Sequence, residues 1–130
     1  MTIMALLTTC TKAETYCRDN HDENQVSKGS PTVDECEALI LAIDPDVNRY
    51  PGRVQEAIYR YGNCIIGGNS SPDAPQPVVT LSGQDLRDII RRSIDTYSYK
   101  FDDGITRVGT KGTTTCGWGE FVTTFDWGLY

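Results

Sequence analysis

The pattern of apolar positions predicts two amphipathic helices. In each of two segments, apolar residues recur at spacings of three and four, which places them on one helical face. The first stripe consists of Val33, Cys36, Leu39, Ile40 and Ile43, and the second of Leu86, Ile89, Ile90, Ile94 and Tyr97. Thr32, with Glu35 three residues later, forms an N-cap signal before the first stripe. Ser82 and Asp85 repeat this signal before the second stripe, and Pro45 ends the first helix.

The segments between and after these helices are typical of strands and turns. Residues 77–81, 105–116 and 121–129 are rich in β-branched and aromatic side chains, which favours strands. In residues 54–66 we expect a strand that ends at 63–66, after a short helical turn. Residues 20–24, 28–31 and 67–77 are polar or rich in Gly, Ser and Pro, which predicts loops. This order predicts an α+β fold in which two helices pack on one face of a mostly antiparallel sheet of about four strands.

Length and composition indicate one folded unit. The chain has 130 residues, of which 38% are hydrophobic and 23% charged, a balance that excludes a disordered tail. We expect residues 1–14 to form a loose N-terminal segment or the remnant of a leader, and residues 15–130 to form a single domain. The net charge of −6 argues against nucleic acid as a partner, and no apolar run is long enough for stable membrane insertion.

The five cysteines predict a disulfide framework. Their spacing contains no Cys-x-x-Cys pair and the chain has a single histidine, so we expect no structural zinc, no other metal and no cofactor. Wide spacing in a small acidic domain favours an oxidising compartment. Cys10 is the candidate free thiol, and the other four cysteines allow three connectivities. The predicted layout favours Cys36–Cys64 and Cys17–Cys116, and the sequon that begins at Asn69 is a candidate glycosylation site.

Candidate catalytic groups are scarce. His21 lies beside Asp22 and Glu23 in a polar segment, where it is either an acid–base or metal group or part of a solvated loop; we favour the loop. The glycine-rich stretches lack the sequence context of phosphate-binding and dinucleotide-binding loops. The sequence therefore predicts a protein that is not an enzyme.

Two surfaces are candidates for contact with a partner. Trp118 lies between two glycines in an expected turn, which makes it the aromatic residue most expected to be exposed. The second surface is the exposed face of the second helix, where the basic residues are densest: Arg87, Arg91 and Arg92. By contrast, the alternation of Phe121, Phe125 and Trp127 predicts that these three side chains are buried in the core.

An ordered set of motifs resembles the necrosis-inducing factor domain of secreted fungal effectors. The motifs are Val33-Asp-Glu-Cys36-Glu-Ala-Leu39, Tyr61-Gly-Asn-Cys64-Ile-Ile-Gly67, Gly83-Gln-Asp85-Leu-Arg-Asp-Ile-Ile90, Arg107-Val-Gly109 and Asp126-Trp-Gly-Leu-Tyr130. The resemblance implies a secreted, cysteine-bridged fungal protein that acts on host tissue and in some members provokes cell death. It also implies no catalytic set, and its four cysteines correspond to Cys17, Cys36, Cys64 and Cys116.

These observations lead to one main functional hypothesis and two alternatives. The main hypothesis is a monomeric, non-enzymatic virulence effector that is secreted to the extracellular space of a plant host. There it binds a host protein or cell-surface component and modulates or provokes cell death. The first alternative is a killer-toxin-like antifungal protein acting on competitor membranes or ion channels, because similar domains occur attached to killer-toxin-like chitinases. The second alternative is a small hydrolase that uses His21.

Overall fold

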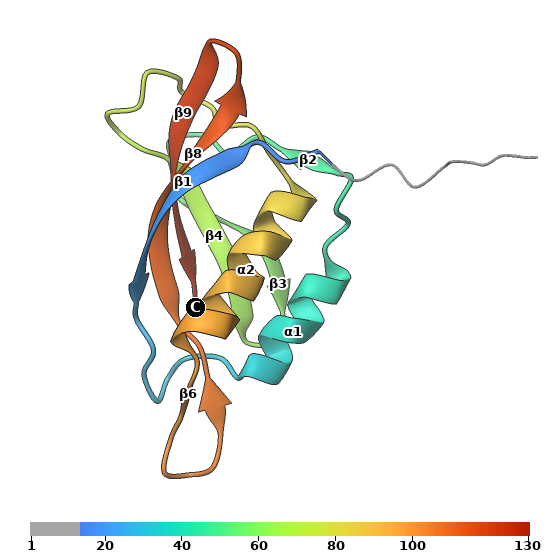
Figure 1. Ribbon diagram of the computed structural model, residues 1–130, viewed down its shortest axis with the longest axis vertical. Helices are drawn as coiled ribbons and strands as arrows, with labels where there is room; N and C mark the ends of the chain where they lie inside the picture. The colour runs from blue at the N-terminus through green and yellow to red at the C-terminus, as the bar shows by residue number, and fades with distance from the viewer. Residues whose placement is uncertain (1–13) are drawn as a thin grey trace, which may run out of the picture.

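The computed structural model describes residues 14–130, in which two helices lie against one face of an antiparallel sheet (Figure 1). The expectations for a loose N-terminal segment and for a free thiol at Cys10 fall outside these residues. In chain order the elements are β1 (Cys17–Asn24), α1 (Val33–Ala42), β2 (Asn48–Arg49), β3 (Glu56–Tyr61), β4 (Cys64–Ser70), β5 (Leu81–Ser82), α2 (Gly83–Tyr97), β6 (Tyr99–Lys100), β7 (Thr106–Arg107), β8 (Thr110–Trp118) and β9 (Phe121–Leu129).

The main sheet has five strands in the order β1-β8-β9-β4-β3, and every neighbouring pair is antiparallel. Two short ladders, β2 with β5 and β6 with β7, lie outside it. The predicted α+β class is confirmed, with one strand more than the expected number of about four. Among residues 14–130, no helix has both the length and the apolar composition needed to cross a membrane.

Several local predictions were wrong. Residues 20–24, expected to be a loop, belong to the edge strand β1. The segment 54–66 is a hairpin rather than a helical turn and a strand, because Gly62 takes φ +57° and reverses the chain between β3 and β4. The expected loop at 67–77 begins only after Ser70, and the strand expected at 77–81 is reduced to the short β5.

The core lies between the helices and the sheet. It contains the apolar stripes of both helices, except for the partly buried Val33 and Tyr97 at their ends, together with Ile66, Val79, Leu81 and the inward side chains of β9. Phe125 and Trp127 are buried there, as predicted. Phe121 was predicted to join them, but it is 56% exposed.

Of the two disulfides, one joins neighbouring strands of the sheet and the other joins a helix to the sheet. Cys17–Cys116 joins β1 to β8, and Cys36–Cys64 joins α1 to β4. This is the pairing that the predicted layout favours. The first disulfide closes a sequence separation of 99 residues and the second a separation of 28 residues.

Both helices begin with the capping box predicted from the sequence. In α1, the Thr32 side chain accepts the Glu35 N–H, and the Glu35 carboxylate accepts the Thr32 N–H at 3.1 Å. The same carboxylate accepts the N–H of Asn63 at 2.8 Å. One side chain therefore caps α1 and holds the turn between β3 and β4.

Acidification is expected to weaken this cap. The N–H groups of Asn63 and Thr32 hold the pKa of Glu35 below its ordinary value of 4.5. A carboxyl group whose pKa is lowered by folding stabilises the protein fully above its unfolded pKa, and this contribution is lost as pH falls through the folded pKa. Unfolding midpoints in urea, measured from about pH 6 down to about pH 3, should therefore converge for the wild-type protein and Glu35→Gln. A constant difference across this window would show that the charge is not the source of the stabilisation.

Candidate functional site

The β8–β9 hairpin ends in a pair of exposed aromatic side chains. Trp118 and Phe121 are cross-strand partners, 59% and 56% exposed, and their ring centroids are 5.3 Å apart. Gly117 and Gly119 on either side of Trp118 take φ values of +129° and +57°, which other residues rarely adopt. We call Trp118 and Phe121 the aromatic tip.

The geometry of the hairpin explains why Phe121 is exposed despite its alternation with Phe125. Both side chains lie on the sheet face that packs against the helices, because side chains alternate between faces along a strand. The hairpin, however, extends past the helical layer (Figure 1). At its end, the apolar face of the sheet is uncovered.

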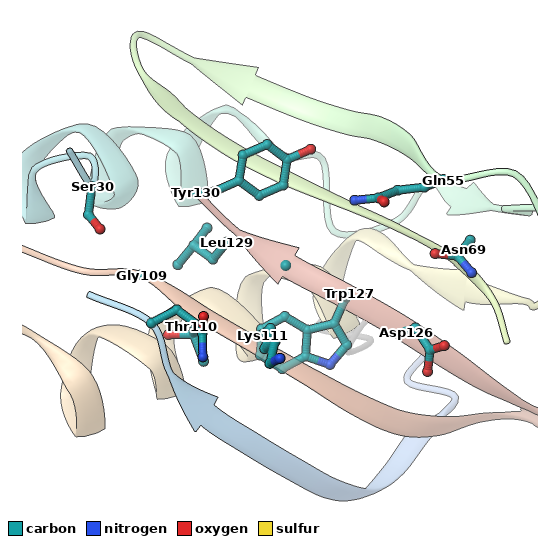
Figure 2. Close-up of a pocket in the computed structure, with 12 residues that line it drawn as sticks. Ser30, Gln55, Asn69, Gly109, Thr110, Lys111, Asp126, Trp127, Leu129 and Tyr130 are labelled. Carbon is teal, nitrogen blue, oxygen red and sulfur yellow. The ribbon is translucent and has the colours of Figure 1, made fainter. Parts of the chain in front are cut away.

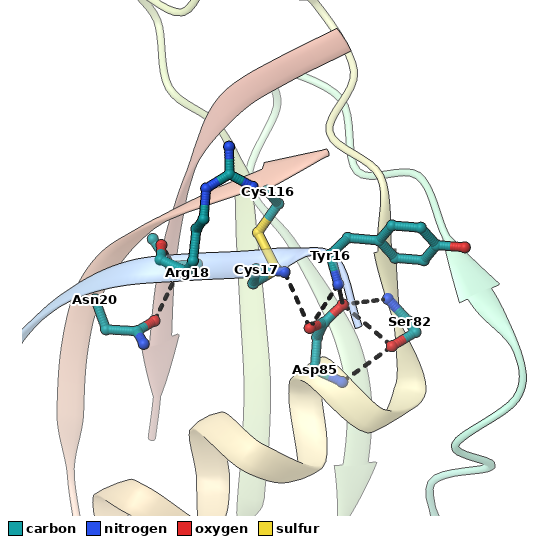
Figure 3. Close-up of a disulfide and its surroundings, with 8 residues drawn as sticks. Tyr16, Cys17, Arg18, Asn20, Ser82, Asp85 and Cys116 are labelled. Carbon is teal, nitrogen blue, oxygen red and sulfur yellow. Dashed lines mark hydrogen bonds between the residues drawn. A yellow bond between two sulfur atoms is a disulfide. The ribbon is translucent and has the colours of Figure 1, made fainter. Parts of the chain in front are cut away.

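The base of the aromatic tip is held at several points. Cys116 is bonded to Cys17, and the Gly117 N–H donates to the Tyr16 carbonyl at 3.0 Å. The buried Asp85 carboxylate, at the start of α2, in turn accepts the N–H groups of Tyr16 and Cys17 (Figure 3). This series of contacts links α2 to β1, and β1 to the hairpin.

The basic residues of α2 do not form one free surface. Arg92 donates two hydrogen bonds to Asp22 of β1, and the Asp22 side chain is only 9% exposed. Arg91 forms an ion pair with Glu37 of α1, with 3.7 Å between nitrogen and oxygen. Arg87 lies in a shallow hollow beside Arg91, next to α1. Two of the three predicted contact residues are thus paired with carboxylates.

A pocket of about 370 Å³ lies on the other side of the sheet (Figure 2). Its lining includes Asn69 and Asp126, which are cross-strand partners, and Tyr130. Asn69 is in β4 rather than in the predicted loop, and its amide donates to the Ser70 carbonyl at 2.9 Å. Glycosylation of Asn69 stays a prediction.

His21 is exposed in β1, where its cross-strand partner is Thr113. It is not among the residues that line the pocket. Within residues 14–130, no group of three or more His, Cys, Asp or Glu side chains is arranged to hold a metal ion.

Where the pKa of a described residue departs from its ordinary value, the largest cause is a local hydrogen bond. A hydrogen bond to Glu14 is the largest cause of the raised pKa of Tyr16. The Ile105 N–H is the largest cause of the lowered pKa of Asp103, in the turn between β6 and β7. The Glu35 and Asp103 hydrogen bonds close a helix cap and a turn, and the Tyr16 bond is an exposed contact between two side chains. A perturbed pKa therefore gives no independent indication of an acid–base site.

Sequence comparison identifies the family of the chain. In a search of curated proteins, no relative matches. A model of the Hce2 family, described as a pathogen effector and putative necrosis-inducing factor, matches residues 16–116. The matched segment contains both disulfides, both helices and most of the sheet. The chain therefore belongs to the Hce2 family of pathogen effectors.

Proposed function

We propose that this protein is a secreted, non-enzymatic effector that binds a plant host protein through its aromatic tip and provokes or modulates cell death. The observation that carries the proposal is the exposure of Trp118 and Phe121 at the end of a braced hairpin. The two disulfides and the family support action outside the producing cell, where disulfides persist.

The chemistry of the aromatic tip favours a protein partner. Trp is enriched among the residues that contribute most to protein–protein binding, since a large ring can be fully desolvated in a pocket on the partner. The bonds at Cys116 and Gly117 fix the base of the hairpin, so little conformational entropy remains to be lost on binding. A net charge of −6 disfavours an anionic membrane surface as the binding partner.

Replacing Trp118 with alanine is expected to reduce the host response at least about tenfold in dose, the effect of losing one strong interface contact. The measurement is infiltration of a dilution series of purified protein into leaves, scored as lesion area or, if the effector suppresses cell death, as protection from a known elicitor. Phe121→Ala should have an effect in the same direction, because the two rings form one surface.

Tyr99→Ala is the matched control. Tyr99 is 57% exposed and packs against Phe101, with 4.9 Å between ring centroids, but it lies in the separate β6–β7 ladder. Its loss should leave the response unchanged. If Trp118→Ala is folded and fully active, or if Tyr99→Ala is equally impaired, the aromatic tip is not the binding surface. Loss of the response in His21→Ala alone would instead favour the hydrolase hypothesis.

A further inference from the structure

Tyr130 lies flat against the sheet face opposite the helices. In β9, Phe125, Trp127 and Leu129 are in the core, so the alternate residues point to the opposite face. A Cβ atom at Gly128 would lie 3.3 Å from Cδ1 of Tyr130, and one at Gly67 would lie 3.0 Å from the Tyr130 hydroxyl.

The two glycines are cross-strand partners and form a floor beneath the ring. Because neither has a side chain, one face of the Tyr130 ring rests on backbone. The other face is turned away from the sheet, and Tyr130 remains 46% exposed. Figure 2 shows the ring nearly face-on above the end of β9. The result is a flat aromatic platform at one end of the pocket.

Polar groups lie beside this platform. Asp126 and Asn69 form the neighbouring cross-strand pair, and Gln55 lies at the β3 side of the pocket. Thr113 donates to Oδ1 of Asp126 at 3.2 Å. Within residues 14–130, Oδ2 of Asp126 and the amide oxygen of Asn69 have no hydrogen-bond donor. The pocket therefore offers, next to an aromatic face, two oxygen atoms that can accept hydrogen bonds from a ligand.

We propose that this pocket binds one sugar ring of a neutral glycan. The flat C–H face of a pyranose would stack on Tyr130, and its hydroxyl groups would donate to Asp126 and Asn69. Lys111, the cation that lines the pocket, is paired with Glu23 at 3.8 Å. Because the free Asp126 oxygen carries negative charge and the local cation is already paired, an anionic sugar or a phosphate is disfavoured. The volume of about 370 Å³ is at the lower end of the range of small-molecule sites.

Two other flat ligands fit the pocket less well. A nucleotide carries phosphate into a protein of net charge −6. A proline ring can stack on an aromatic residue, but proline has no N–H, so it supplies no donor for the free oxygen of Asp126. A sugar supplies both a stacking face and several donors. This site is on the opposite sheet face from the aromatic tip, so the inference is independent of the proposed function.

The test is titration of the isotope-labelled protein with neutral hexasaccharides, namely cellohexaose, laminarihexaose, chitohexaose and mannohexaose, followed by NMR. Polygalacturonate and a proline-rich peptide are the competing ligands. We expect at least one neutral hexasaccharide to bind at micromolar to millimolar concentration and to shift the amide signals of Gly67, Asn69 and Gly128. Tyr130→Ala should weaken binding about tenfold or more, the loss of one stacking contact. Tyr130→Phe keeps the aromatic ring and should therefore retain binding of the hexasaccharide.

Matched variants separate the pocket from the rest of the surface. Tyr61→Ala removes a ring that is 51% exposed on β3 but does not line the pocket, and it should bind as the wild-type protein does. Trp118→Ala should also bind the sugar normally, even if it is inactive on leaves. The proposal is overturned if no neutral hexasaccharide binds, if binding survives in a folded Tyr130→Ala variant, or if polygalacturonate or the peptide shifts the pocket signals instead.

Discussion

Replacing Cys17 and Cys116 together with alanine is expected to lower the free energy of unfolding by about 4–5 kcal/mol. The bond closes a separation of 99 residues, so its loss releases a long loop in the unfolded chain and increases the entropy of that state. Alanine is chosen because it buries no hydroxyl group in place of the sulfur. The measurement is urea unfolding without reductant, followed by tryptophan fluorescence.

The second disulfide provides the internal comparison. Cys36 and Cys64 are fully buried, whereas Cys17 is partly buried. The separation of Cys36 and Cys64 is 28 residues, for which the same chain-entropy argument gives about 3–4 kcal/mol. The two double variants should therefore differ by about 1 kcal/mol, with the loss of Cys17–Cys116 costing more. The reverse order would mean that contacts in the folded state, rather than loop length, determine what each bond contributes.

The helices could be predicted from the sequence because their signals are local. Thr32 and Ser82 start their helices as predicted, each with its capping box, and the apolar stripes are the buried faces. The β8–β9 hairpin was also predictable in outline, since two strand-like segments flank the glycines around Trp118. These features depend on residues close together in the chain.

β1 could not be predicted in the same way because contacts distant in sequence stabilise it. Its sequence, CRDNHDEN, has no apolar alternation. It forms as an edge strand through pairing with β8, the Cys17–Cys116 bond and the burial of Asp22 against Arg92. The β3–β4 hairpin did have a local signal, since Gly62-Asn63 is a two-residue connection of the kind that joins strands.

The candidate sites likewise combine features with local sequence signals and features that depend on distant contacts. Exposure of Trp118 followed from its place between glycines, whereas exposure of Phe121 depends on how far the helices extend along the sheet. The platform at Tyr130 depends on the register that pairs Gly67 with Gly128. Neither of these can be read from a hydrophobic pattern.

Asp85→Asn is expected to destabilise the protein by about 2–4 kcal/mol. The Asp85 side chain accepts the N–H groups of Tyr16, Cys17 and Ser82 and the hydroxyl of Ser82, while the residue is 3% exposed. An amide has one acceptor oxygen instead of two, so its NH₂ group must face N–H donors. At least one of these buried or partly buried donors then loses its partner.

Glu35→Gln is the matched control, since it makes the same change in the capping box of α1. Glu35 is partly exposed, so the N–H groups that it accepts can bond to water instead. We therefore expect the free energy of unfolding to fall by about 0.5–1.5 kcal/mol.

Hydrogen exchange separates the two variants further. Asp85 also holds Tyr16 and Cys17, and the Gly117 N–H donates to Tyr16. Exchange of the Gly117 N–H should therefore accelerate in Asp85→Asn and not in Glu35→Gln. Equal losses of stability in the two variants, with no change in exchange at Gly117, would mean that Asp85 caps its own helix without bracing the aromatic hairpin.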